Sequence, residues 1–364
     1  MQVQSIDKSV RSESNSFELV DVTSAVSRKA GVQPAFMTAL LSGMTENHFQ
    51  ISDKVVYDEI IENQQLVSGK RFDEVGGGKV TLDSGKEKMF RTGSFGISGK
   101  VSVADVYGKR KFGEEGAYSI EDRVAELTVK MQRGWNLFEE MSYAQLLTAD
   151  TNYTAGGAAK SYNFHTDIVG SSRAVATDLL LGSAADDVVN KINAKVDALQ
   201  ENASKAGISY QAVFMVCGGT LFDKLFDLEQ TVAAGVFALN PATPLDLTAY
   251  GVSRSNFEGQ SLSFMRRHFT SALTGVTYVR VPDSVTGTPF LPTDNGIMIP
   301  VGATNMFARI YSTILHKDYY DMVAMPKYGF MKEHDREGVT LYEEQNVLYM
   351  NKYPELIQHF TSSD

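Results

Sequence analysis

The clearest pattern of apolar and polar positions runs from residue 119 to about residue 148. Apolar residues recur there in steps of three and four, which is the spacing of one face of an α-helix. Ser119 and Asp122 have the spacing of a capping box at the start of this helix. About 30 residues at 1.5 Å each predict a helix of roughly 45 Å, with Trp135 as a core anchor. The apolar positions are Ile120, Val124, Leu127, Met131, Trp135, Phe138 and Met141.

Residues 51–112 contain two stretches of strand-like alternation on either side of the glycine tip Gly76–Gly78. Two such stretches around a glycine tip predict a long two-stranded hairpin. Because an isolated two-stranded ribbon is marginal in water, we expect it to lie on another surface. The apolar positions of the two stretches are Val55, Val56, Tyr57, Ile60 and Ile61, then Phe90, Phe95, Ile97, Val101 and Val103.

Residues 1–50 begin rich in serine and become weakly amphipathic toward Phe36, Leu40 and Leu41. A compact domain rarely starts with so long a weakly patterned stretch. The pattern therefore predicts an arm that needs a partner surface to become ordered.

The pattern after Gly156 and Gly157 is that of an α/β unit. A helix through Val188 and Leu199 is expected to end at Gly207, which suits the left-handed C′ position. The continuous apolar run 212–217 predicts a strand buried on both faces, followed by a Gly-Gly turn and a helix from Leu221 to Val232. Further strands are expected at 277–281, 296–300 and 307–314, so the fold class is α+β.

Composition narrows the class of protein. The chain has 364 residues, and the 43% that are hydrophobic are ample for a core. The length fits two domains, or one domain with large insertions, and the net charge is -10. The acidic balance argues against binding nucleic acid by neutralising phosphates, although a container that surrounds DNA fits it. A single cysteine, Cys217, excludes an intrachain disulfide and fits assembly in a reducing cytoplasm. No apolar run is long enough to span a bilayer.

Few residues are candidates for chemistry. Gly218 and Gly219, between a strand and a helix, allow a phosphate-cradling turn, but a simple tight turn with Thr220 as N-cap is favoured because no phosphate-loop motif accompanies them. Cys217 has no histidine nearby in sequence and is expected to be a buried, inert thiol.

No metal site, cofactor site or catalytic site is expected. The histidines lack the spacing of metal ligands; they are His48, His165, His268, His316, His334 and His359. Adjacent acids point in different directions, so solvated faces or intersubunit ion pairs are favoured over acid–base catalysis at Glu114–Glu115, Glu139–Glu140 and Glu343–Glu344. The basic cluster Arg266–His268 allows a DNA-facing patch, but an ion-paired strand edge is favoured.

Three places in the sequence resemble the lambda-type major capsid proteins of tailed phages, the major capsid protein E family. They are Lys54–Ile60, the strand–Gly–helix run Val213–Phe226, and Phe290–Asn295 with the aromatic and strand segments that follow. The resemblance covers residues 45 to 360.

This resemblance implies the Hong Kong 97-like capsid fold. In that fold residues 1–50 form an N-terminal arm, 51–112 an extended hairpin loop, 113–160 a peripheral domain with its spine helix, 161–312 an axial α/β domain, and 313–364 the peripheral C-terminal strands. The hairpin tip is expected to contact a neighbouring subunit; its residues are Lys70, Arg71, Gly76, Gly77, Gly78 and Lys79.

The resemblance also implies an architectural role. Pentamers and hexamers of the chain would form an icosahedral shell around double-stranded DNA, without sequence-specific binding, with scaffolding, portal and decoration proteins as partners. Two rival readings stay open: the shell of a bacterial nanocompartment with protein cargo, and a soluble α/β enzyme that binds a phosphorylated ligand at Gly218–Gly219.

Overall fold

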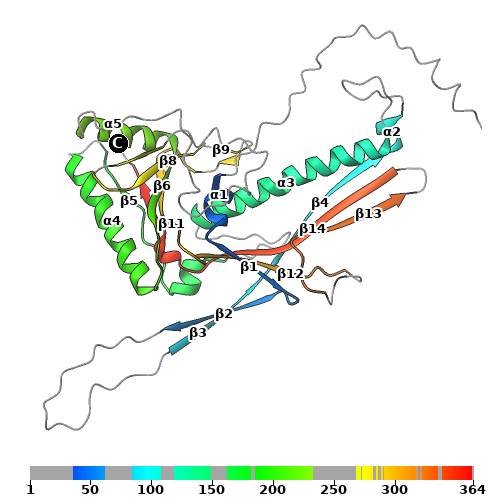
Figure 1. Ribbon diagram of the computed structural model, residues 1–364, viewed down its shortest axis with the longest axis horizontal. Coiled ribbons are helices and arrows are strands. Elements are labelled where there is room, and N and C mark those ends of the chain that lie inside the picture. Colours follow the sequence, from blue (N-terminus) through cyan, green and yellow to red (C-terminus); the bar gives the residue numbers. More distant parts are fainter. Residues whose placement is uncertain are drawn as a thin grey trace, which may run out of the picture.

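The structure is a computed structural model of the full chain. It describes residues 36–61, 84–107, 119–148, 162–181, 185–232, 268–271, 273–281, 284–285, 288–289, 291–316, 319, 322–334 and 338–362. The described part is elongated, with one sheet and two helices at one end and long strands beside a long helix at the other (Figure 1).

A five-stranded sheet forms the extended end. Its centre is β14 (Gly338–Asn351), which pairs with β4 (Gly93–Ser102) along one edge. Along its other edge β14 pairs first with β13 (Tyr328–His334) and then with β12 (Phe307–Ser312). The outer strand β1 (Thr45–Gln50) runs parallel to β12. The long strand β14 thus pairs with three of the other four strands of the sheet.

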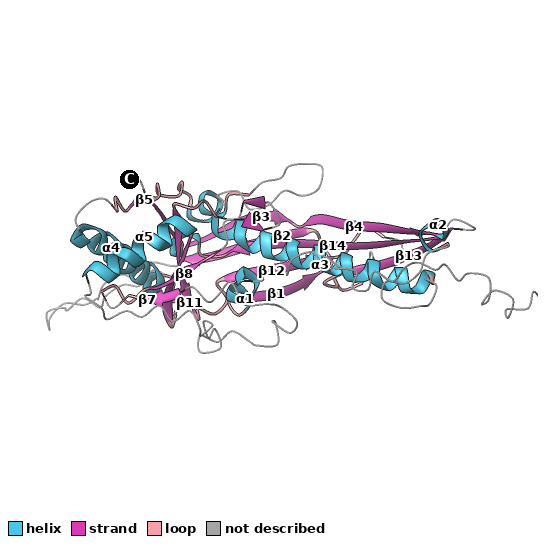
Figure 2. Cartoon of the chain, turned by 90° about the horizontal axis from the view of Figure 1, so that it is seen from above, coloured by secondary structure: helices cyan, strands magenta, loops and turns pink. Residues whose placement is uncertain are grey.

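The long helix predicted from the sequence is confirmed as α3 (Ile120–Thr148). Its capping box is also present, because Ser119 Oγ accepts from the Asp122 amide at 3.0 Å while the Asp122 carboxylate accepts from the Ser119 amide at 3.3 Å. Trp135, 8% exposed, donates its indole N–H to Glu343 of β14 at 2.7 Å. This helix therefore lies along β4 and β14, as Figure 2 shows.

A six-stranded sheet forms the other end, in the order β5, β15, β11, β6, β8, β7. Helices α4 (Ala185–Lys205) and α5 (Gly219–Val232) lie beside it (Figure 1). Helix α4 ends at Lys205, and Gly207 closes it as predicted: its φ is +67°, and the amide of its neighbour Ile208 donates back to Ala203 at 2.9 Å. The strands are β5 (Thr177–Asp178), β15 (Gln358–Thr361), β11 (Asn295–Val301), β6 (Ala212–Cys217), β8 (Thr277–Arg280) and β7 (His268–Thr270).

The central strand β6 separates two apolar cores. Phe214 and Val216 face a core that also takes in α1 and the end of α3, whereas Met215 and Cys217 face a second core against α4 and α5. Because both faces of β6 are covered, its sequence is apolar at every position. The predicted doubly buried strand is confirmed.

The other described elements are short. Helix α1 (Phe36–Ser42) precedes β1, and β2 (Lys54–Ile61) pairs with β3 (Ser84–Arg91) to form a two-stranded antiparallel ribbon. The remaining elements are α2 (Val103–Val106), η2 (His165–Val169), the pair β9 (Ser284–Val285) and β10 (Thr288–Pro289), and η6 (Pro354–Leu356).

The hairpin is shorter than the sequence pattern predicts. Its returning strand ends at Arg91, and residues 93–102 pair with β14 instead. The reason is packing: Phe95 on β4 meets Phe138 on α3 with ring centroids 4.4 Å apart. The alternation from Phe95 to Val101 does form a strand, but the partner of this strand lies about 240 residues further along the chain, and Val103 begins helix α2.

The strands near two expected domain boundaries, at residues 50 and 312, pair across those boundaries. Residues 36–50 find their partner surface within the same chain, because Met37, Leu40 and Leu41 are fully buried and β1 pairs with β12. Across the expected boundary at residue 312, β12 joins the five-stranded sheet and β15 joins the six-stranded sheet. The rest of the division into domains stays a prediction.

The turn after β6 is closed by backbone from the segment before β11. The Gly218 amide donates to Asn295 at 2.9 Å, and the Leu221 amide in the first turn of α5 donates to Thr293 at 3.0 Å. Thr220 is inside the helix and is not its N-cap, because α5 begins at Gly219. The N-terminus of α5 is therefore capped by a main-chain carbonyl of the Pro292–Asn295 turn.

We expect Gly218→Ala to destabilise the fold. A Cβ at this position would lie 2.3 Å from the Pro292 oxygen and 2.6 Å from the Thr293 oxygen, and both are backbone atoms that cannot rotate away. The expected loss is about 2 kcal/mol or more, measured by urea denaturation. Gly329→Ala is the control, because nothing lies within 4 Å of its Cβ position and the expected change is within about 0.5 kcal/mol. Equal losses in both variants would contradict this account of the turn.

Candidate functional site

The hairpin-tip residues predicted as an intersubunit contact lie outside the described part of the chain. These residues are Lys70, Arg71, Gly76, Gly77, Gly78 and Lys79. Their contact role stays a prediction. Glu114, Glu115 and the basic pair Arg266–Arg267 also lie outside it.

The Gly218–Gly219 turn has no room for a phosphate. The carbonyl groups of Pro292 and Thr293 lie against Gly218, and Thr293 takes the helix amide that a phosphate would need. Cys217 beside it is fully buried, and burial raises the pKa of its thiol far above the usual range. The turn thus joins two segments of the chain, and the prediction of a buried thiol is confirmed.

Among the described residues, no group of three or more His, Cys, Asp or Glu side chains is arranged to hold a metal ion. No described helix is long and apolar enough to cross a membrane.

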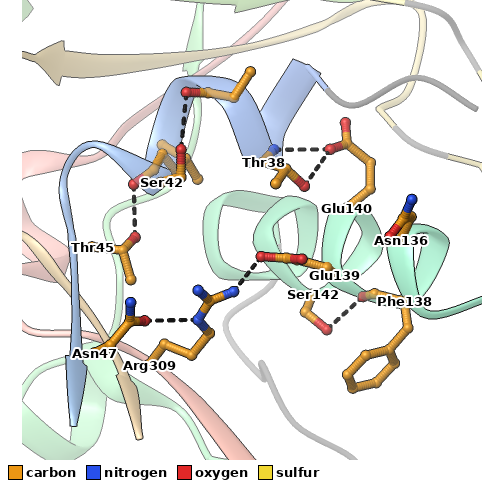
Figure 3. Close-up of polar contacts among 12 residues, drawn as sticks. Thr38, Ser42, Thr45, Asn47, Asn136, Phe138, Glu139, Glu140, Ser142 and Arg309 are labelled. Atoms are coloured by element: carbon orange, nitrogen blue, oxygen red, sulfur yellow. Dashed lines mark hydrogen bonds and ion pairs between the residues drawn. The ribbon is translucent and has the colours of Figure 1, made fainter. Parts of the chain in front are cut away.

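One member of the Glu139–Glu140 pair is completely buried. Glu140 has no exposed surface, and its carboxylate accepts hydrogen bonds from the Met37 and Thr38 amides, each at 2.8 Å. The Thr38 hydroxyl donates a third bond at 2.9 Å. The first amides of a helix lack partners within the helix, so Glu140 of α3 acts as the cap of α1 from 103 residues away (Figure 3).

The other member of the pair reaches a different segment. Glu139 forms an ion pair with Arg309 on β12, and Arg309 donates to the Asn47 side chain on β1 at 2.8 Å. The guanidinium also lies over the Tyr311 ring, 5.4 Å from its centroid. As Figure 3 shows, neighbouring carboxylates on one helical turn point toward α1 and toward β12.

Burial changes the protonation of this junction. It raises the pKa of the Glu140 carboxyl from 4.5 to about 7, although the Thr38 and Met37 hydrogen bonds act in the opposite direction. Burial likewise raises the pKa of Tyr311 to about 12, so this phenol is neutral beside Arg309. Glu140 therefore changes charge near neutral pH.

Together the two carboxylates anchor residues 36–50 to the body of the protein. Glu140 fixes the start of α1, and Glu139 fixes β1 through Arg309. The sequence predicts solvated faces or intersubunit ion pairs at Glu139–Glu140 and Glu343–Glu344. In the structure the bonds of Glu139 and Glu140, and those of Glu343 with Trp135 and Lys327, are within one chain. Sequence alone gives no signal for a cap 103 residues distant.

The base of the ribbon has one buried and one open face. Val55 and its register partner Phe90 are buried, and the Phe90 ring lies 5.2 Å from the Tyr162 ring. The next pair, Val56 and Met89, points the other way and is 51% and 57% exposed. The ribbon thus rests on its own chain through one face and presents an apolar pair on the other.

The comparisons with known proteins agree on one class. A family model described as "Phage major capsid protein E" matches residues 18–362. No curated protein matches the chain. Among solved structures, the capsid of the cyanophage P-SCSP1u is 10% identical, with 95% of this chain and 94% of that chain covered and a TM-score of 0.53. The mature capsid of bacteriophage PhiM1 is also 10% identical, with 92% and 89% covered and a TM-score of 0.52. These structures share the fold.

We expect Glu140→Gln to loosen the junction. An amide nitrogen cannot accept a hydrogen bond, so one amide of α1 would lose its acceptor in a buried site. The expected loss at pH 5 is about 1 to 3 kcal/mol in the free energy of unfolding, measured with urea. Glu121→Gln on the same helix is the control, because Glu121 is exposed and should change stability by only a few tenths of a kcal/mol, about the size of a dipole effect. A Glu140→Gln variant as stable as this control would refute the role of Glu140 as a cap.

Stability should depend on pH through the same carboxyl. A folded-state pKa of about 7, above the unfolded value of 4.5, means that the folded protein binds the proton more tightly. The contribution is therefore fully present below pH 4.5 and is lost as pH rises through about 7. The expected loss is at most on the order of 3 kcal/mol. Unfolding curves between pH 4.5 and 8 should show this slope in the wild type but not in Glu140→Gln, and identical slopes would contradict the assignment.

Proposed function

Because this chain belongs to the phage major capsid protein E family and is the major capsid protein of a phage head shell, we propose that it closes this shell through the surfaces left open by its own fold. The α+β fold with two sheets and a long helix is the Hong Kong 97-like fold of its structural neighbours. The ribbon carries the argument: one face of its base is buried on its own chain, while the opposite face exposes Val56 and Met89.

We assign the open face of the ribbon to a neighbouring copy of the chain. Exposed apolar side chains paired across a two-stranded ribbon gain free energy when another surface covers them. The tip beyond the described strands extends the same contact through Lys70, Arg71, Gly76, Gly77, Gly78 and Lys79. In this arrangement the hairpin of one subunit overlaps the next, within pentamers and hexamers of an icosahedral shell.

The residues before Phe36 have a second role in this proposal. Helix α1 is fixed to α3 by Glu140, so the chain leading to it starts from a fixed point on the body. A segment tethered at one end stays close to its attachment point, so its effective concentration at an adjacent subunit is high. This N-terminal arm then ties subunits together.

Further partners follow from the role in the head. Scaffolding and portal proteins guide closure, a decoration protein can cover the finished shell, and assembly takes place in the host cytoplasm. The enclosed double-stranded DNA is held without sequence-specific binding, which suits a chain with a net charge of -10. The role is structural and not enzymatic.

Neither rival function is favoured. A nanocompartment shell would share the fold, but the matched family is that of phage major capsid proteins. An enzyme with a phosphorylated ligand at Gly218–Gly219 would need a helix N-terminus that Thr293 already occupies.

Electron microscopy with light scattering tests the assembly. We expect the purified chain, alone or co-expressed with the phage scaffolding protein, to form closed shells or free pentamers and hexamers. Copurifying DNA supports a phage head, and copurifying enzyme cargo would support the nanocompartment. A uniform monomer or dimer under all these conditions would refute the proposal.

Met89→Glu tests the ribbon surface in the same assay. Met89 is 57% exposed, so a charge there should leave the urea midpoint nearly unchanged while it opposes burial against a neighbour. We expect a large fall in the yield of closed shells. Glu87→Gln is the matched control, because Glu87 lies two residues away on the same strand face and is also exposed. Normal shell yield from Met89→Glu would exclude this face as a contact.

A further inference from the structure

A cavity of about 250 Å³ lies beside the six-stranded sheet, and no residue of the ribbon or of the Glu139–Glu140 junction lines it. Three segments form its wall: the residues after η2, the helix α4, and the C-terminal segment that leads into β15. The cavity is thus bounded by parts of the chain that only the fold brings together.

The wall is rich in groups that donate hydrogen bonds or carry positive charge. Arg173 and Lys195 are the cations, and Ser171 and Ser172, which carry hydroxyl groups, also line the cavity. Within the described part of the chain no residue pairs with the Lys195 ammonium group. One carboxylate, Glu355, shares the wall, so the two cations leave an excess of positive charge in a chain whose net charge is -10.

Of the two histidines that line the cavity, His359 positions Arg173. Arg173 Nη1 lies 2.8 Å from His359 Nε2. A guanidinium group can only donate, so the His359 nitrogen accepts and its ring is neutral with the proton on Nδ1. His165, which also lines the cavity, lies with Nδ1 2.8 Å from the backbone carbonyl oxygen of Ser171, and this contact holds the loop that carries Ser171 and Ser172. Arg173 and this loop are therefore held in place before any ligand arrives.

We infer that this cavity binds a phosphate-type oxyanion. A planar guanidinium, an ammonium group and two hydroxyls are the donors that such an anion takes in proteins. The size fits as well, because a water molecule accounts for roughly 30 Å³ of liquid and the cavity of about 250 Å³ holds a phosphate group with a few waters. A free phosphate ion and a phosphodiester of nucleic acid share this chemistry. The inference does not depend on shell assembly.

Inorganic phosphate is the first probe. The full-length protein is titrated with phosphate at constant ionic strength set by sodium chloride, and its melting temperature is followed. We expect a saturable rise in melting temperature, since a ligand that binds only the folded state stabilises it. No rise beyond that given by chloride would overturn the inference.

Lys195→Gln and Lys130→Gln separate the site from general charge effects. Lys195 lies in the cavity wall, whereas Lys130 is exposed on α3, and each variant removes one positive charge. We expect phosphate to bind Lys195→Gln about tenfold more weakly and Lys130→Gln as it binds the wild type, because a charge-assisted bond contributes on the order of 1.4 kcal/mol. Equal affinities for wild type and Lys195→Gln would overturn the site. Both variants should fold, since neither lysine has a described partner.

A short single-stranded oligonucleotide without terminal phosphates distinguishes the two sources of the anion. If it competes with phosphate in the wild type, and competes about tenfold less well in Lys195→Gln, the cavity takes phosphodiesters of nucleic acid. If phosphate binds with the expected dependence on Lys195 and the oligonucleotide does not compete, the cavity takes the free ion. Failure of shell assembly in any of these variants bears on the proposed function, and loss of phosphate binding bears only on this site.

Discussion

A carboxyl group buried away from solvent needs hydrogen bonds from the protein, and Glu140 finds them in the first turn of α1. The constraint acts in both directions, because the seven-residue helix α1 has no acidic residue of its own in its first turn. The long helix thus caps the short one, and the short one solvates a buried acid. Neighbouring Glu139 uses the same turn of α3 to fix Arg309, which in turn fixes β1 through Asn47.

The same junction ties the two ends of the molecule into one body. The core that surrounds α1 takes side chains from β6 and β11 of one sheet and from β12 and β14 of the other. The Pro292–Asn295 turn adds a second tie, because its backbone closes the start of α5. One continuous core therefore joins the two sheets, and the ribbon packs on it through the contact of Phe90 with Tyr162.

The surfaces of the subunit divide accordingly. Contacts made within the chain use buried carboxylates, backbone caps and aromatic pairs, whereas the open ribbon face offers Val56 and Met89. The cavity lined by Arg173 and Lys195 belongs to neither set, since no residue of the ribbon or of the junction lines it. The proposed contact face and the proposed anion site therefore use different residues of one fold.

The sequence by itself determined the elements whose signals are local. The three- and four-residue steps from Ile120 to Met141 gave α3 together with its Ser119–Asp122 cap, Gly207 marked the end of α4, and the unbroken run 212–217 marked a strand covered on both faces. Together with the resemblance at Lys54–Ile60, these were enough for the α+β class and the capsid family. Only the tertiary structure decided which distant segments meet. It moved 93–102 from the hairpin to β14, gave residues 36–50 a partner surface in their own chain, and turned Glu139–Glu140 from solvated acids into anchors. The physical reason is that periodicity and capping act within a few residues, whereas strand pairing and the burial of a carboxylate depend on groups a hundred or more residues away.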